Sequence, residues 1–312
     1  MKADILEDLS ARRRADAALR ELREPFAAVL ARARETPPPP DFAAAFAGPG
    51  AHVIAELKKA SPSEGIIRDT FDPVALAREL EDAGAAALSV LCEPHRFLGS
   101  EAYLRAARAE VTIPVLCKDF VTTPYQVAAA RAAGASAVLL IAAVLDDARL
   151  RELLAFCHAL GFAALVETHD ADEIRRAVRA GARVVGVNCR DLRTFRTDPS
   201  ITARLLGEIP PERVRIAESG IKTADDIRRL SDAGAQGFLI GTTLMRAAKP
   251  GERLRELKGT GDSEGGDLRG ASGMRDRRGG RDRSDERGKR GGRDRSDERG
   301  KSEEGTEEAK RG

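Results

Sequence analysis

The sequence contains few cysteines and histidines, and their spacing excludes several kinds of site. Among 312 residues there are four of each. The cysteines, Cys92, Cys117, Cys157 and Cys189, form no CxxC pair. Apart from His169, which follows Glu167 by two residues, no HxH or His–carboxylate metal spacing is present. We therefore expect free, mostly buried thiols in the reducing cytoplasm, and neither a structural zinc, a disulfide nor a cofactor.

Long apolar runs and an excess of charge of one sign are also absent. No stretch approaches the roughly 18 apolar residues of a membrane span. The first six residues include Asp4 where a secretion signal has its apolar segment. The formal net charge of +2 is too small to indicate a nucleic-acid partner. These absences predict a soluble cytoplasmic protein with no membrane or nucleic-acid partner.

Short β-type runs alternate with helical stretches between residues 51 and 258. The expected strands span residues 53–57, 87–91, 115–118, 137–142, 163–167, 184–188, 215–218 and 237–240. Helices are expected between them, for example at 73–83, 124–133, 148–160, 171–180 and 224–233, and several run into Ala-Gly-Ala, a helix-ending signal. Eight apolar strands indicate a parallel sheet buried on both faces, and eight strands close a (β/α)8 barrel. An open doubly wound sheet is the alternative, although no glycine-rich dinucleotide turn follows the first strand.

The two ends of the chain differ from this middle part. Apolar residues recur at helical spacing over residues 3–34, and four prolines, residues 37–40, follow as a stiff spacer. Residues 1–50 are thus expected to form a helical extension packed on a catalytic barrel of residues 51–258. Residues 259–312 have almost no apolar side chains, and their charged segment 279–289 recurs at 291–301. We expect a disordered, dispensable tail, with weak RNA or protein binding as the alternative.

Ionisable or amide side chains end several of the expected strands. Glu56 and Lys58 share one face of the first strand, because strand side chains alternate between faces. Taken alone, this pair also fits an exposed edge strand with a surface ion pair. Further strands end in Lys118, Glu167, Asn188 and Glu218. Since the carboxyl ends of barrel strands meet at the mouth where active sites lie, the pattern predicts a site for general acid–base catalysis.

Glycines and small hydroxyl residues follow the last two strands, as Ser219-Gly220 and Gly241-Thr242. Tight turns alone would explain these glycines. Such loops also let backbone N–H groups approach an anion, and they lie where barrels usually bind phosphate. Their presence after both strands predicts a small phosphorylated substrate.

Taken together, these motifs resemble the indole-3-glycerol phosphate synthase family of tryptophan biosynthesis. The similar segments are residues 54–63, 89–94, 97–100, 118–120, 166–167, 186–188, 190–192 and 218–221, in the family's order within residues 3–257. The resemblance implies a TIM barrel of the ribulose-phosphate-binding type with a helical N-terminal extension. It also implies a carboxy-lyase that converts 1-(2-carboxyphenylamino)-1-deoxyribulose 5-phosphate to indole-3-glycerol phosphate, with loss of carbon dioxide and water. No cofactor and a monomer or weak homodimer are expected.

The resemblance also gives roles to the matching positions. Lys118 resembles the general acid of ring closure, and Glu167 would orient it or stabilise developing positive charge. Glu56 and Lys58 would serve the later proton removal and dehydration, with the acid of each step open between the two lysines. The other implied site residues are Asn188, Arg190 and Glu218 around the substrate, Phe97, Phe120 and Leu139 against it, and Ser219, Gly220, Gly241 and Thr242 at the phosphate, helped by Ser61 or Lys58.

Small departures and two rival functions accompany this resemblance. Cys92 stands where the family has threonine, a near-isosteric change, and the position of Thr242 varies in the family. Another phosphate-binding barrel enzyme of the pathway is one rival. The phosphoribosylanthranilate isomerase of that pathway would have a cysteine base on the first strand and an aspartate on the sixth. This chain has Glu56 and Asn188 there. An inactive barrel acting as a binding scaffold is the other, and the retained ionisable residues count against it.

Overall fold

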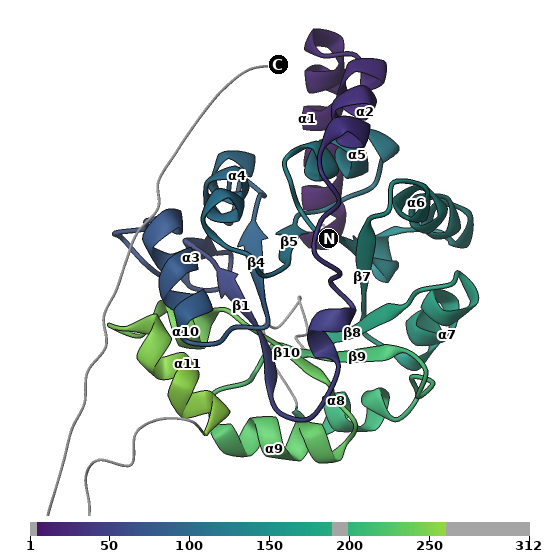
Figure 1. Cartoon of the computed structure of the whole chain (residues 1–312). Coiled ribbons are helices and arrows are strands. Elements are labelled where there is room, and N and C mark those ends of the chain that lie inside the picture. The colour runs from purple at the N-terminus through teal and green to yellow at the C-terminus, as the bar shows by residue number, and fades with distance from the viewer. Residues whose placement is uncertain (1–4, 189–198, 260–312) are drawn as a thin grey trace, which may run out of the picture. The chain divides into compact units, whose positions relative to one another are not determined.

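Eight parallel strands close into a barrel in the order β1-β10-β9-β8-β7-β6-β5-β4 (Figure 1). The structure, a computed structural model, describes residues 5–188 and 199–259. The barrel strands are β1 (His52–Leu57), β4 (Ala87–Leu91), β5 (Val115–Lys118), β6 (Ala137–Ile141), β7 (Ala163–Thr168), β8 (Val184–Asn188), β9 (Val214–Glu218) and β10 (Gly237–Ile240). The predicted (β/α)8 barrel is confirmed, and the open-sheet alternative is wrong. Each predicted strand limit lies within one residue of the observed one.

Helices surround the barrel and connect its strands. They are α3 (Pro73–Asp82), α4 (Glu101–Glu110), α5 (Pro124–Ala132), α6 (Asp147–Ala159), α7 (Ala171–Arg179), α8 (Pro199–Leu206), α9 (Ala224–Asp232), α10 (Thr242–Met245) and α11 (Pro250–Lys258). The Asp72 and Thr123 side chains cap α3 and α5, each followed by a proline that fits the first helical turn. Gly134, after α5, has φ of 89°, as a left-handed helix end requires.

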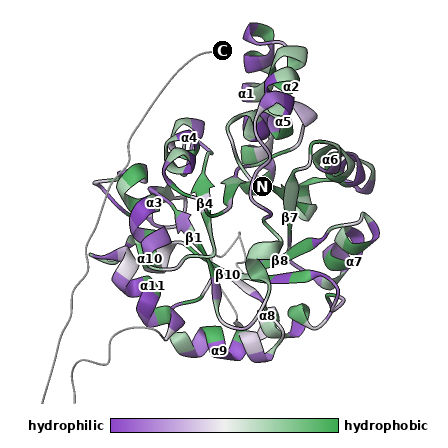
Figure 2. Cartoon of the chain, viewed as in Figure 1, coloured by the Kyte–Doolittle hydropathy of each residue, from purple (hydrophilic) through white to green (hydrophobic). Residues whose placement is uncertain are grey.

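Two apolar layers hold these elements together. The larger layer lies between the strands and the helices, where Leu80 of α3, Leu104 of α4 and Leu150 of α6 are fully buried. The second fills the inside of the barrel and includes Ile54 and Leu116. Figure 2 accordingly shows hydrophobic strands and helices with one hydrophobic and one hydrophilic side. The strands are therefore buried on both faces, as their nearly continuous apolar sequences predicted.

The chain before the barrel forms two helices and a connecting segment. These are α1 (Ile5–Arg23), α2 (Phe26–Glu35) and the short 3-10 helix η1 (Ala44–Phe46). Helix α2 packs on α5, and the buried Arg131 of α5 donates hydrogen bonds to the carbonyls of Thr36 and Pro37 at the start of the proline spacer. Phe46 lies inside the barrel, where a side chain on Gly237 would collide with its ring.

Helix α1 is fixed to the barrel by a partly buried ion pair. Arg13 donates hydrogen bonds to both carboxylate oxygens of Asp119, at 2.8 and 3.1 Å from Nε and 2.6 Å from Nη2. Asp119 directly follows Lys118 at the end of β5, so α1 is held beside the barrel mouth. Leu6 and Leu9 of α1 are buried in the same apolar cluster as Phe120.

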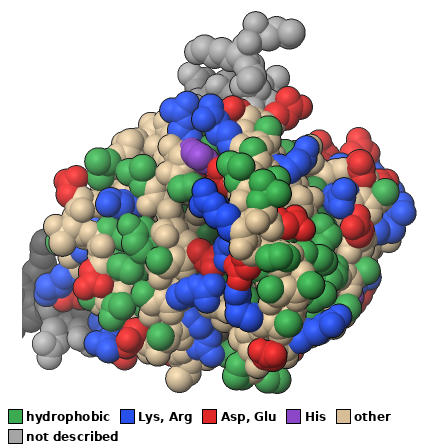
Figure 3. Space-filling view, turned by 90° about the horizontal axis from the view of Figure 1, so that it is seen from above, with side chains coloured by type: hydrophobic (Ala, Val, Ile, Leu, Met, Phe, Trp, Pro, Cys, Tyr) green, Lys and Arg blue, Asp and Glu red, His purple; other side chains and the backbone are tan. Residues whose placement is uncertain are grey.

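The outer surface carries interspersed charge. Figure 3 shows Lys and Arg mixed with Asp and Glu over the face that it presents. Exposed pairs within one helix, such as Arg12 with Asp8, contribute to this mixture. Within residues 5–188 and 199–259, no helix is long and apolar enough to cross a membrane.

Candidate active site

A cavity of about 470 Å³ opens at the carboxyl ends of the strands. Its walls include every predicted site residue that the structure describes: Glu56, Lys58, Ser61, Phe97, Lys118, Phe120, Leu139, Glu167, Asn188, Glu218, Ser219, Gly220, Gly241 and Thr242. Arg190, the remaining predicted residue, lies outside the described residues. Residues far apart in the sequence thus meet because each ends a strand of one closed barrel.

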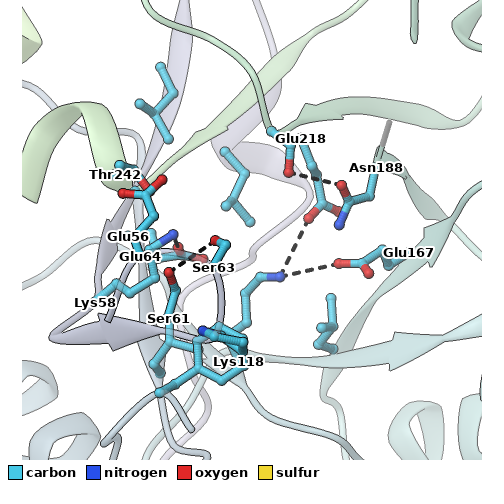
Figure 4. A pocket seen from close by; sticks show the side chains of 18 of the residues that line it. Glu56, Lys58, Ser61, Ser63, Glu64, Lys118, Glu167, Asn188, Glu218 and Thr242 are labelled. Atoms are coloured by element: carbon cyan, nitrogen blue, oxygen red, sulfur yellow. Dashed lines mark hydrogen bonds and ion pairs between the residues drawn. The ribbon is translucent and has the colours of Figure 1, made fainter. Parts of the chain in front are cut away.

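The buried Lys118 ammonium lies between two carboxylates. Its Nζ is 3.2 Å from Glu167 Oε2 and 3.6 Å from Glu218 Oε2 (Figure 4). The two glutamate side chains are only 3% and 1% exposed, so their charges are poorly screened by water. Burial lowers the pKa of Lys118, but the neighbouring charges of Glu167, Glu218 and Glu56 outweigh it and raise that pKa above its ordinary value. Lys118 is therefore held as an ammonium ion.

The two carboxyl groups beside Lys118 differ in their ionisation. Burial and the charge of Glu167 raise the pKa of Glu218 to about 8. Burial also disfavours the charge of Glu167, but Lys118 and His169 lower its pKa to about 2. Two carboxylates in one buried site cannot both ionise easily, so one of them keeps a proton. The pKa values of the two groups therefore move apart, so that Glu167 is ionised and Glu218 keeps a proton at neutral pH.

A second ion pair lies on the other side of the mouth. Lys58 Nζ is 2.9 Å from Glu56 Oε1, and their side chains are 10% and 5% exposed. Burial disfavours the Glu56 carboxylate, yet the charges of Lys58 and Lys118 lower its pKa. Both side chains point into the barrel while Leu57 between them packs in the outer apolar layer. The prediction that Glu56 and Lys58 share one face is confirmed, and the exposed edge strand is excluded.

Apolar side chains form one end of the cavity. The rings of Phe97 and Phe120 lie with centroids 6.3 Å apart, and Leu139 lies on the same wall. Phe97 belongs to the loop after β4, which Glu93 shapes by accepting hydrogen bonds from three backbone N–H groups, those of His95, Arg96 and Phe97. Such a wall fits a flat aromatic group.

Glycines and hydroxyls form the opposite end. Ser219 has φ of 65°, a strained conformation for a residue with a side chain, and Gly220 follows at 75°. The Ser219 hydroxyl donates a 2.8 Å hydrogen bond to Asn188 Oδ1. The Thr242 hydroxyl is buried and meets no hydrogen-bond partner within the part of the chain that the structure describes. A buried hydroxyl beside glycine turns fits an anionic group of a ligand.

Sequence reasoning missed part of this cavity. Ile5, Leu6 and Leu9 of α1 line its apolar end, and Glu64, Lys222 and Arg246 line its polar rim. Glu64 lies between the two-residue strands β2 (Ala60–Ser61) and β3 (Gly65–Ile66) and forms a 2.7 Å ion pair with Arg246. The apolar helical spacing of α1 signalled a buried face, but nothing local to the sequence shows that this face covers the barrel mouth.

An ammonium ion between carboxylates at a barrel mouth defines a TIM-barrel enzyme of the acid–base class. The family model described as indole-3-glycerol phosphate synthase matches residues 6–257. Two curated indole-3-glycerol phosphate synthases, from two strains of Acidithiobacillus ferrooxidans, are each 45% identical over 258 residues, covering 81% of this chain and 98% of theirs. The chain belongs to the indole-3-glycerol phosphate synthase family, whose members are carboxy-lyases of tryptophan biosynthesis. The predicted family is confirmed.

Solved structures of lower identity share the fold. A 3-hexulose-6-phosphate synthase from Salmonella typhimurium aligns with a TM-score of 0.56 at 15% identity, covering 67% of this chain and 97% of the other. An orotidine 5'-phosphate decarboxylase from Pyrococcus horikoshii OT3 gives 0.51 at 12% identity, covering 67% and 98%. At such identities the likeness concerns the barrel alone.

Proposed function

We propose that this chain closes the indole ring of 1-(2-carboxyphenylamino)-1-deoxyribulose 5-phosphate and releases indole-3-glycerol phosphate, carbon dioxide and water. The position of Lys118 between Glu167 and Glu218 carries this proposal, because ring closure leaves an alkoxide that needs a nearby cation and a proton. The family membership supports the same reaction. The substrate's carboxyphenyl ring would lie against Phe97 and Phe120, and its phosphate at the glycine turns after β9 and β10.

Lys118 acts in the first step. As the ring carbon bonds to the ketone carbon, the ketone oxygen becomes an alkoxide, and the Lys118 ammonium stabilises it and donates a proton. A lysine kept charged by its neighbours suits this step, since an alkoxide is basic enough to take its proton. Glu167 orients the ammonium through its 3.2 Å contact. Holding both reacting carbons in one bound conformer contributes further to the rate.

Decarboxylation and dehydration complete the sequence. Carbon dioxide leaves readily because the ring carbon bearing the carboxylate is no longer aromatic after closure. The new hydroxyl then departs as water. Glu218, which carries a proton at neutral pH, and Lys58 are the donors placed for this departure, and the ionised Glu56 is the base for the accompanying proton. Glu56 and Lys58 thus act from one side of the mouth, and Lys118 and Glu218 from the other.

The phosphate end fixes the substrate's orientation. Backbone N–H groups of Gly220 and Gly241 and the hydroxyls of Ser219 and Thr242 would bind the phosphate oxygens, since glycine permits close backbone approach. Ser61, which lies 3.3 Å from the Ser63 hydroxyl on the β2–β3 turn, closes this end. Asn188 would contact the middle of the substrate. Arg190 would do the same by analogy with the family motif.

Three cysteines bear on the compartment in which the enzyme works. Cys92, Cys117 and Cys157 are buried free thiols, and the first two keep 3.6 Å between their sulfur atoms. Thiols this close remain unpaired in a reducing compartment, which supports a cytoplasmic enzyme. We propose that it works as a monomer or weak homodimer, with a small phosphorylated substrate as its one required partner.

Turnover of the synthetic substrate by the purified chain tests this function. Indole fluorescence should appear together with one equivalent of carbon dioxide, and the product mass should equal that of indole-3-glycerol phosphate. Release of carbon dioxide without an indole product, or no reaction while phosphate compounds still bind, would contradict the proposal. Substrate lacking the phosphate should react with a much higher KM, because it loses the contacts of the glycine turns.

A further inference from the structure

His169 lies at the edge of the cluster around Lys118 and has no role in the steps above. It directly follows β7, where Glu167 points into the cavity and Thr168 points away and donates a 2.7 Å hydrogen bond to the Gly186 carbonyl. Alternation along the strand returns the His169 side chain to the side of Glu167. The imidazole is 20% exposed, so it lies between the buried cluster and the solvent.

Glu173 of α7 fixes the imidazole in place. One carboxylate oxygen, Oε2, lies 3.1 Å from His169 Nδ1 and accepts a 2.7 Å hydrogen bond from the His169 backbone N–H. The Asp170 side chain caps α7 by accepting a hydrogen bond from the Glu173 N–H. The start of a helix thus holds Glu173, and Glu173 holds Nδ1 as a hydrogen-bond donor. The other ring nitrogen, Nε2, is left facing the active site.

Nε2 of His169 lies 3.5 Å from Glu167 Oε1. The other oxygen of Glu167, Oε2, lies 3.2 Å from Lys118 Nζ. Glu167 therefore has a cationic group at each of its two oxygens when His169 is charged. Lys118 Nζ also lies 3.6 Å from Glu218 Oε2. The contact with His169 adds a second cation beside Glu167 and favours the ionised form of its carboxyl group.

We propose that His169 is a positioning residue that keeps Glu167 ionised, so that the proton shared by the two carboxyl groups lies on Glu218. The inference rests on the proposed function and adds to it the residue that assigns the acid. Among the described residues, the carboxyl groups that act on His169 are those of Glu167, Glu173 and Glu218. Burial lowers the pKa of His169, but these three outweigh it and raise the pKa, which favours the imidazolium form that the proposal requires.

Replacement of the imidazole by a neutral side chain should redistribute the proton. In His169→Gln the two carboxyl groups, Glu167 and Glu218, hold their shared proton more tightly. The proton partly moves to Glu167, and this weakens the contact between Glu167 and Lys118. We expect kcat at pH 7 to fall about tenfold, a fraction of a full general acid's contribution, while KM changes less than twofold. The alkaline limb of the kcat profile should move upward by about one pH unit, since an opposite charge at this distance shifts a carboxyl pKa by that much or more.

Two other variants separate positioning from structural effects. Glu173→Gln keeps the ring but lowers the pKa of His169, so it should match the wild type near pH 6 and lose activity near pH 8. His158→Gln makes the same substitution at an exposed position of α6 and should leave kcat and the alkaline limb of its pH profile unchanged. Thermal unfolding of all variants identifies any loss of fold. If His169→Gln does not fold, the activity of Glu173→Gln at pH 6 and pH 8 tests the role of His169 instead. A wild-type ratio of the two activities would then overturn the inference.

The test also has a readout that needs no turnover. With four histidines in the chain, nitrogen NMR of the imidazoles can follow His169 and His158 separately. His169 should titrate above the ordinary imidazole value of 6.5, and its pKa should fall in Glu167→Gln. An unchanged His169 titration in Glu167→Gln, or a wild-type kcat profile in His169→Gln, would overturn the inference while leaving the proposed function intact. Failure of the wild type to form an indole would overturn the function, and the NMR result would still decide the role of His169.

Discussion

The Glu56 carboxylate occupies the space that a side chain on Gly241 would need. A Cβ at Gly241 would overlap Glu56 Oε1 and come within 3.0 Å of Lys58 Nζ. Gly241 is thus required by a buried ion pair of another strand as well as by the turn that we assign to the phosphate. The same holds across the mouth, where a Cβ at Gly186 would overlap Glu218 Oε1. Two glycines therefore make room for two buried carboxyl groups.

Substitution of these glycines should separate phosphate binding from proton transfer. Gly241→Ala should lower kcat at least tenfold and raise KM, because it displaces Glu56 and narrows the phosphate end. Gly186→Ala, the matched control, displaces Glu218 but leaves the Gly241 turn intact, so kcat should fall while KM rises less than in Gly241→Ala. Steady-state kinetics on both variants measures this difference. Equal KM values in the two variants would argue against a phosphate site at Gly241.

Ionisation of Glu218 should set the upper limit of the working pH range. Its pKa of about 8 means that the carboxyl group is protonated below this pH and ionised above it. If the protonated form is the acid of dehydration, kcat should fall as pH rises through about 8. Glu218→Gln should lack this alkaline limb and show a residual rate lowered by about 10² to 10⁴. If the fall of kcat at alkaline pH persists in Glu218→Gln, the titrating group is a residue other than Glu218.

The same group should cost stability at alkaline pH. Because the folded pKa of about 8 exceeds the ordinary value of 4.5, the folded state binds more protons than the unfolded state between these values. The contribution of Glu218 to stability is therefore full below about pH 4.5 and is lost as pH rises through about 8. Glu218→Gln should gain stability over the wild type at pH 9 and little at pH 5, as measured by chemical denaturation. An equal difference at both pH values would contradict this titration.

The partly buried ion pair between Arg13 and Asp119 should hold α1 over the mouth. Arg13→Met leaves the Asp119 carboxylate, 7% exposed, without its main partner. We expect the free energy of unfolding to fall by about 3 kcal/mol, as for other buried pairs that lose one member. Arg12→Met, one residue away, removes an exposed contact to Asp8 and should change it by less than about 0.5 kcal/mol. Similar values for the two variants would show that α1 is not clamped by Arg13.

Residues after 259 should be dispensable for catalysis. The family match ends at residue 257, and α11 ends at Gly259, whose φ of 73° closes the helix. A chain ending at residue 259 should keep kcat/KM within about twofold, since it keeps the whole segment that the family model matches, residues 6–257. A large loss of turnover on truncation would mean that the charged tail contributes to the site.

The sequence predicted the barrel and most of the cavity for one physical reason. The carboxyl ends of the strands in a parallel barrel meet at one mouth, independently of the loop conformations. Glu56, Lys118 and Glu218 could therefore be placed together from their positions at the ends of predicted strands. The observed cavity contains them all. The position of an ionisable residue at a strand end was thus enough to predict that it lines the cavity, without knowledge of any distance.

Features that depend on long-range contacts could not be predicted in this way. Arg13 and Asp119 are 106 residues apart, and neither is unusual in its local sequence. The lining of the cavity by Leu6 and Leu9 depends on how α1 crosses the mouth. The proposed position of the shared proton on Glu218 depends on the contacts of Glu167 with Lys118 and His169 in the folded barrel, which no sequence pattern encodes.

The role of Lys118 is the central claim, and a single-turnover experiment with Lys118→Ala tests it most directly. Enzyme in excess over substrate separates binding from chemistry. Substrate affinity should depend mainly on the phosphate and apolar ends of the cavity, to which Lys118 does not contribute. We predict that the variant binds substrate within about tenfold of the wild type, while indole formation slows by about 10³ or more. Ring closure within tenfold of the wild-type rate would contradict the account and place the essential acid elsewhere in the mouth.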